Sequence, residues 1–156
     1  MRVHICAVGR LRAGPEHELV DDYLGRFDRT GRALGLGPVS MTEVEDKKGG
    51  GKKSETAMLK KSIPKNSLIC VLDERGEVMS STDFARQLAR WRDDGQQDVA
   101  FVLGGANGID RAMRARAKAS LSFGQMVWPH MLARVMLAEQ LYRAATILAG
   151  GPYHRS

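Results

Sequence analysis

The stretch DVAFVLGGANG, Asp98 to Gly108, decides the fold. After Asp98 it runs through five apolar residues, a pattern typical of a strand buried on both faces of a parallel sheet. The cluster Gly104-Gly105-Ala106-Asn107-Gly108 ends that strand, and we expect a helix to follow to about Ala119. Open α/β sheets bind ligands at such points, because free backbone N–H groups gather where strands end and helices begin. A plain tight turn is the other interpretation of these glycines.

The same alternation of strands and helices runs along the rest of the chain. Further strands are predicted at Met1 to Val8, within Gly37 to Val44, at Leu68 to Leu72 and at Leu121 to Phe123, with an extension to Val127 left open. Helices are predicted from Pro15 to about Phe27, from a capping Ser54 to about Ser62, from Ser80 to about Arg92 and from Pro129 to about Ala149. We therefore expect one α/β domain over residues 1–156, with a mostly parallel sheet and helices on both faces.

Composition narrows the class of protein. The chain has 156 residues, of which 43% are hydrophobic and 27% charged, so it can bury a real core. Its 24 Lys and Arg against 18 Asp and Glu give a net charge of +6. Such a surplus favours an anionic partner, with nucleic acid first.

The apolar segments, cysteines and histidines predict the compartment of the protein and whether it has a zinc site. Val3 to Val8 is too short and too interrupted for a signal peptide, and charges within the apolar C-terminal stretch make it a poor membrane span. Cys6 and Cys70 each lie in a short apolar run, which predicts buried, reduced thiols in a cytoplasmic protein. No spacing of Cys and His in the sequence fits a zinc site.

Two basic segments have competing interpretations. The stretch from Asp46 to Lys53 is predicted to be a flexible basic loop; it lacks the Gly-Lys-Ser/Thr order of a phosphate-binding loop, although its lysines could touch phosphate. Arg111, Arg114 and Lys118 are predicted on one helix face, at i, i+3 and i+7. That stripe could follow an RNA backbone or be an ordinary solvated face.

The C-terminal segment combines an apolar helix with a polar tip. A helix that is apolar on nearly all sides must be buried widely, either in the core or against a second subunit. Within it, Glu139 and Arg143 stand at i and i+4 with the acid first, the favourable order for an ion pair. Gly150-Gly151-Pro152 ends the helix, and Tyr153-His154-Arg155 follows. These three side chains beyond a defined helix stop are candidate functional residues.

Several blocks together resemble the RlmH family of small SPOUT-class methyltransferases, which act on large-subunit ribosomal RNA. The blocks are VHICAVG at 3–9, Leu72-Asp73 before Gly76, Gly104 to Gly108, Leu121 to Phe123, Pro129-His130, Arg134-Val135, EQLYRA at 139–144 and Tyr153 to Arg155. They span nearly the whole chain, and the last two are the most specific. The segment 30–53 departs from the family, because it is glycine-rich where family members show a clearer strand.

The resemblance implies a C-terminal trefoil knot, a homodimer and S-adenosyl-L-methionine bound on the knot loops. The positions that match the family's cofactor site are Leu72, Gly104, Phe123, Gly124, Gln125, Met126, Val127 and Trp128. The implied reaction is methylation of N3 of a pseudouridine in 23S ribosomal RNA, on the assembled ribosome. No metal is expected, because the cofactor carries the hard chemistry.

The tail residues would then meet the RNA base. His154 is a candidate proton acceptor for N3, and Arg155 could stabilise the developing negative charge or hold a phosphate. Tyr153 could stack on a flipped base or hydrogen-bond to it. We expect the tail of one subunit to complete the cofactor pocket of the other. Two alternatives stay open: a non-catalytic basic module that binds ribosome or RNA, and a different nucleotide-binding enzyme on the same scaffold.

Overall fold

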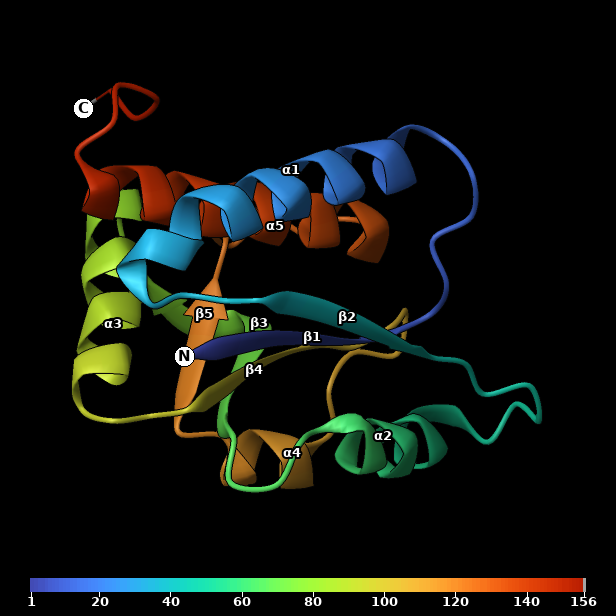
Figure 1. Cartoon of the computed structure of the whole chain (residues 1–156). Coiled ribbons are helices and arrows are strands. Elements are labelled where there is room, and N and C mark those ends of the chain that lie inside the picture. Colours follow the sequence, from blue (N-terminus) through green and yellow to red (C-terminus); the bar gives the residue numbers. More distant parts are fainter. Residues whose placement is uncertain (156) are drawn as a thin grey trace.

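A five-stranded parallel sheet lies at the centre of the molecule (Figure 1). The computed structural model describes residues 1–155. The elements in chain order are β1 (Arg2–Val8), α1 (Pro15–Gly31), the 3-10 helix η1 (Arg32–Leu34), β2 (Val39–Val44), α2 (Gly51–Ser62), β3 (Leu68–Val78), α3 (Ser81–Asp93), β4 (Asp98–Leu103), α4 (Arg111–Arg116), β5 (Ala119–Ser122) and α5 (His130–Ala149). The predicted α/β class and single parallel sheet are confirmed.

The strand order is β2-β1-β4-β3-β5, so the apolar run at Asp98–Leu103 lies in the middle and is buried throughout. One face of the sheet packs against α1, α3 and α5, and the other against α2 and α4 (Figure 1). Helices therefore cover both faces, as predicted. Cys6 and Cys70 are buried free thiols, also as predicted. The trefoil knot stays a prediction of the family resemblance.

Three predicted helix boundaries are wrong. The first helix runs to Gly31 and not to about Phe27. The other two differ for a local reason. The second helix begins at Gly51 and not at a Ser54 cap, because Asp46 already accepts hydrogen bonds from the backbone N–H groups of Lys48 and Gly50 and forms the turn itself. The helix after the glycine cluster ends at Arg116 and not near Ala119. Ala117 has extended backbone there, which leads directly into β5.

The first turns of α5 are tied to the sheet by a buried arginine. Arg134 is 1% exposed, and its Nη1 lies 2.8 Å from Oε2 of Glu43 on β2. Its Nη2 donates to the carbonyl oxygens of Val8 and Gly9 at the end of β1, at 3.1 Å each. Burial lowers the pKa of Arg134, and the carboxylate of Glu43 opposes that shift. One side chain thus joins α5 to the carboxyl ends of two strands.

Replacing Arg134 by Ala is expected to lower the free energy of unfolding by about 3–5 kcal/mol, because Glu43 would keep a partly buried charge without its partner. Urea titration of the purified protein measures this. The exposed Arg90→Ala on α3 is the matched control and should change stability by less than about 0.5 kcal/mol. Equal stability of both variants would contradict a structural role for this ion pair.

Candidate active site

A pocket of about 740 Å³ opens at the carboxyl edge of the sheet. Three segments form most of its wall: residues 72–75 of β3, the loop 103–109 after β4, and the loop 123–130 that leads into α5. Lys52 of α2 and Arg114 of α4 complete the rim. A cavity of this size suits a small organic ligand.

The β3 wall of the pocket is a break in the strand ladder. Leu72 pairs with Leu121, and so does Glu77, so that residues 73–76 leave the ladder between them. Gly76 allows this, because a Cβ at that position would lie 2.9 Å from the backbone carbon of Leu121. Residues 73–75, which leave the ladder at this break, line the pocket.

The glycine cluster is both a tight turn and a pocket wall. A Cβ on Gly104 would lie 2.5 Å from the carbonyl oxygen of Gly108, and Gly108 has a φ of +75° that favours glycine. The N–H of Gly108 donates to the carbonyl of Gly105 at 3.0 Å. Asn107 Nδ2 lies 3.3 Å from Oε1 of Glu55, which ties the turn to α2. The two interpretations of the sequence are therefore compatible.

An ion pair lies on the pocket wall. Arg114 Nη1 is 3.2 Å from Oδ2 of Asp73. Burial alone would raise the pKa of Asp73, but hydrogen bonds from the backbone N–H of Arg75 and from Arg114 outweigh it and leave that pKa below its ordinary value. The carboxylate is therefore negative at neutral pH. The predicted stripe of Arg111, Arg114 and Lys118 on one helix face is wrong, since the helix ends before Lys118 and Arg114 is paired at the pocket.

The loop before α5 supplies an apolar rim that is largely exposed. Met126 is 76% and Val127 83% exposed, and Trp128 stands beside them with its Nε1 3.4 Å from the carbonyl oxygen of Phe123. Of the eight predicted cofactor positions, seven line the pocket: Leu72, Gly104, Phe123, Gly124, Met126, Val127 and Trp128. Gln125 is not among the lining residues. Their role in binding a cofactor stays a prediction.

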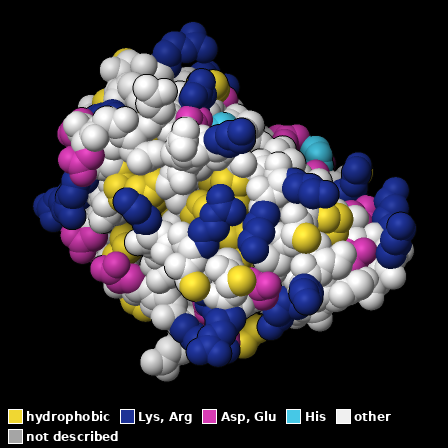
Figure 2. Space-filling model, turned by 90° about the horizontal axis from the view of Figure 1, so that it is seen from below, with side chains coloured by type: hydrophobic (Ala, Val, Ile, Leu, Met, Phe, Trp, Pro, Cys, Tyr) yellow, Lys and Arg dark blue, Asp and Glu magenta, His cyan; other side chains and the backbone are white. Residues whose placement is uncertain are grey.

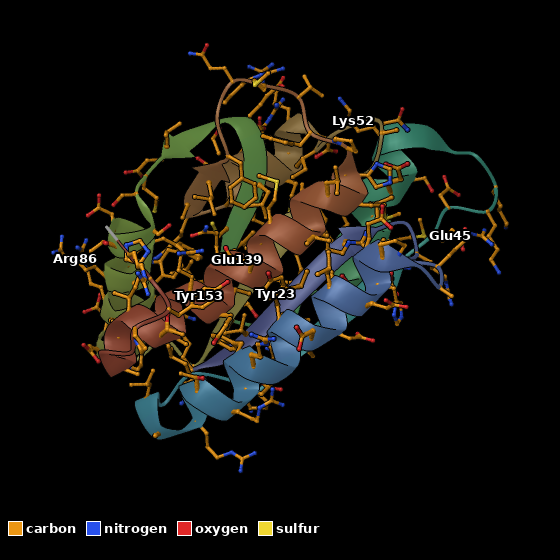
Figure 3. All side chains as sticks on the ribbon, turned by 90° about the horizontal axis from the view of Figure 1, so that it is seen from above. Tyr23, Glu45, Lys52, Arg86, Glu139 and Tyr153 are labelled. Carbon is orange, nitrogen blue, oxygen red and sulfur yellow. The ribbon has the colours of Figure 1, made fainter. Side chains whose placement is uncertain are left out.

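The tail does not reach this pocket. The pocket contacts the first turn of α5, whereas the tail leaves the C-terminal end of this 20-residue helix and folds back to Glu139, about 9 Å along the axis from Ala133. In Figure 3, Tyr153 lies beside Glu139, whereas Lys52 of the pocket rim lies beyond the other end of the helix. Within one chain, therefore, Tyr153, His154 and Arg155 do not line the pocket.

The tail is held against its own helix by a compact polar cluster. Arg143 Nη2 is 2.6 Å from Oε1 of Glu139, and this confirms the predicted helix pair. The hydroxyl of Tyr153 donates to the same oxygen at 3.0 Å, and its ring lies 4.8 Å below the guanidinium of Arg143. His154 Nδ1 is 3.2 Å from Nη1 of Arg143. Partial burial, followed by the bond to Glu139, raises the pKa of Tyr153 to about 12. Tyr153 is therefore a neutral hydroxyl near neutral pH.

Comparison with known proteins gives the family. The model of a family described as "Predicted SPOUT methyltransferase" matches residues 1–154. A protein of Dinoroseobacter shibae named "Ribosomal RNA large subunit methyltransferase H" is 68% identical over 155 residues, with 99% of each chain covered. Its namesake in Roseobacter denitrificans is 67% identical over 156 residues, with 100% of each covered. The chain belongs to the RlmH family of SPOUT methyltransferases.

Solved structures agree with the fold of this RlmH-family chain. A probable methylase family protein from Haemophilus influenzae Rd KW20 has a TM-score of 0.55 at 11% identity, covering 99% of this chain and 70% of that one. A probable methyltransferase from Bordetella pertussis Tohama I has a TM-score of 0.52 at 15% identity, covering 92% and 96%. At such low identity these likenesses concern the fold alone.

Sequence reasoning missed two features of this family member's site. Asp73 directly follows the apolar run 68–72, and a charged residue at a strand's carboxyl end is a signal that could have identified it. Glu55, which holds the glycine loop, has no such local signal. Across residues 1–155, no group of His, Cys, Asp and Glu side chains could hold a metal ion, and no helix is long and apolar enough to cross a membrane.

Replacing Gly104 by Ala in this RlmH-family chain is expected to cost about 1–3 kcal/mol of folding free energy, because the added methyl group meets backbone atoms of Gly108. Gly25→Ala adds the same methyl group within α1, where its nearest neighbour is the flexible end of Arg29 at 3.5 Å, and should stabilise by about 0.5–1 kcal/mol. Denaturant unfolding compares the two. Stabilisation by both would show that the loop accommodates a side chain.

Proposed function

We propose that this chain is an S-adenosyl-L-methionine-dependent methyltransferase of large-subunit ribosomal RNA, which acts on N3 of a pseudouridine in the assembled ribosome. The observation that carries the proposal is the pocket of three loops at the carboxyl edge of the sheet, in a chain of this family. The RNA substrate in this proposal is taken from the names of its close relatives.

The pocket has the chemistry that S-adenosyl-L-methionine requires. Its rim offers apolar and aromatic surface for a purine ring at Met126, Val127 and Trp128, and its loops offer backbone polar groups for the ring edge. Asp73 lines the pocket as a carboxylate that is paired with Arg114. When bound, the cofactor supplies an electrophilic methyl group on a positively charged sulfur. The protein must then align the acceptor and exclude water.

The exposed face formed by α2 and α4 suits an RNA backbone. Figure 2 shows Lys and Arg side chains gathered on the face seen from below, where these two helices lie in Figure 1. The exposed basic residues of this region are Lys52, Lys53, Lys60, Lys61, Lys65, Arg111, Arg116 and Lys118. Because Lys52 also lines the pocket, phosphates held on this face would lead the RNA towards the site.

The separation of the tail from the pocket supports a homodimer. Tyr153 and His154 are held at Glu139 and Arg143, about 9 and 15 Å along α5 from Ala133 at the pocket, so they do not line the pocket of their own chain. The tail of a second copy would supply them there. The exposed apolar residues beside the pocket, Met126 and Val127, are suitable for burial against that copy.

A labelled-methyl assay on intact ribosomes, separated subunits and naked RNA tests the reaction. We expect incorporation into assembled ribosomes, and mass spectrometry of the digested RNA should find the label on N3 of a pseudouridine. Calorimetry with the cofactor alone should show binding. Ribosome binding without incorporation and without cofactor binding would instead identify a non-catalytic module.

Mixing two inactive variants tests whether the tail acts in the other subunit. One variant lacks residues 153–156 and the other carries Gly104→Ala; each alone should be inactive while still forming a dimer. Random exchange of subunits should restore about a quarter of wild-type turnover, since half the dimers are mixed and each has one complete site. No recovery after verified exchange would contradict a site shared between subunits.

A further inference from the structure

The contact between Arg143 and His154 fixes which nitrogen of the imidazole carries hydrogen. Arg143 Nη1 lies 3.2 Å from Nδ1 of His154. A guanidinium only donates hydrogen bonds and stays protonated in proteins. Nδ1 must therefore be the acceptor in this contact, and the neutral ring carries its hydrogen on Nε2.

Arg143 cannot easily turn away from this contact. Its Nε and Nη2 both donate to Oε1 of Glu139, at 2.9 and 2.6 Å, and its plane lies over the ring of Tyr153. These bonds occupy one edge of the guanidinium and leave Nη1 for His154. The carboxylate of Glu139 also raises the pKa of Arg143, so the donor stays charged.

The contact with Arg143 occupies Nδ1 of His154. A hydrogen on Nδ1 would point at the N–H of Arg143 and break this bond. The other charged or titratable groups of the cluster are Glu139 on α5, Tyr23 and Arg26 on α1, and Tyr153 and Arg155 beside His154 in the chain. Of these, Glu139 already accepts from both Arg143 and Tyr153.

We propose that Arg143 is a positioning residue that holds His154 as an Nε2–H donor, and that His154 stabilises negative charge on the target base instead of accepting its proton. This inference rests on the proposed function. It replaces the sequence-based interpretation of His154 as the proton acceptor with a different role at the same site.

The chemistry of the base fits a donor. N3 of a uracil ring lies between two carbonyl groups, so loss of its proton to solvent spreads the negative charge onto the flanking oxygens. The lone pair of N3 then forms the bond to the methyl carbon, and the electron pair of the carbon–sulfur bond returns to sulfur, which becomes a neutral thioether. A hydrogen bond from Nε2 to a flanking oxygen stabilises the charge on the base before and during transfer.

The tautomer can be measured on the free protein, without RNA or cofactor. In ¹⁵N NMR of the imidazoles, His154 is expected to show a protonated Nε2 and an unprotonated Nδ1, its signals being identified by their absence from His154→Gln. Arg143→Gln should change this pattern, because an amide oxygen can accept from Nδ1–H. Arg29→Gln, an exposed position on α1, should not. A protonated Nδ1 in the wild-type protein would overturn the inference.

Kinetics separate a donor from a base at His154. The amide nitrogen of glutamine reaches about as far as imidazole Nε2 and carries hydrogen, whereas that of asparagine is shorter. His154→Gln should therefore keep turnover within about tenfold of wild type, while His154→Asn and His154→Ala lose about 100-fold or more. Equal losses in all three would overturn the inference and favour a base. If the wild-type protein methylates no RNA, the proposed function fails, and the NMR experiment still decides the tautomer.

Discussion

The buried guanidinium of Arg134 is the interaction on which the arrangement of the site depends. It joins the start of α5 to Glu43 on β2 and to two carbonyl oxygens at the end of β1, and it is almost fully removed from water. A buried charge is tolerated only where its partners are fixed, so this contact allows little variation in where α5 begins. The loop from Phe123 to Pro129 leads into this helix start, and it lines the same pocket as the glycine turn after β4.

The same helix, α5, also connects the pocket to the C-terminal tail. Its first turn lines the pocket, while its middle turns hold Tyr153 and His154 through Glu139 and Arg143. About 9 and 15 Å of helix separate Ala133 at the pocket from Glu139 and Arg143, and the contacts of the tail keep it at those two residues and away from the pocket. Under the proposed function, a dimer brings the tail of one subunit to the pocket of the other.

Local signals explain which parts could be predicted from the sequence. The apolar run Asp98–Leu103 and the start of a helix at Ser80 were predicted correctly, because burial on both faces and helix starts depend on neighbouring residues. The start of α2 at a Ser54 cap and the length of α4 were predicted wrongly. At α2, the turn formed by Asp46 starts the helix earlier, at Gly51. The pair Arg134–Glu43 spans 91 positions, and the two residues meet only after the sheet has formed. No pattern in either segment indicates that contact.

Under the inference above, the tail cluster presents one preorganised donor, the Nε2–H of His154. Tyr153 keeps its proton, since its pKa is about 12 and its hydroxyl already donates to Glu139. Arg143 is bound on one edge by Glu139 and directs the other at His154, which leaves the imidazole N–H directed elsewhere. Because every contact is made within one chain, the second subunit would receive the tail in its working conformation. Donors fixed in advance cost little reorganisation when charge develops on the base, and this is the condition under which electrostatic stabilisation is most effective. A tail that ordered only on reaching the partner's pocket would lose that advantage.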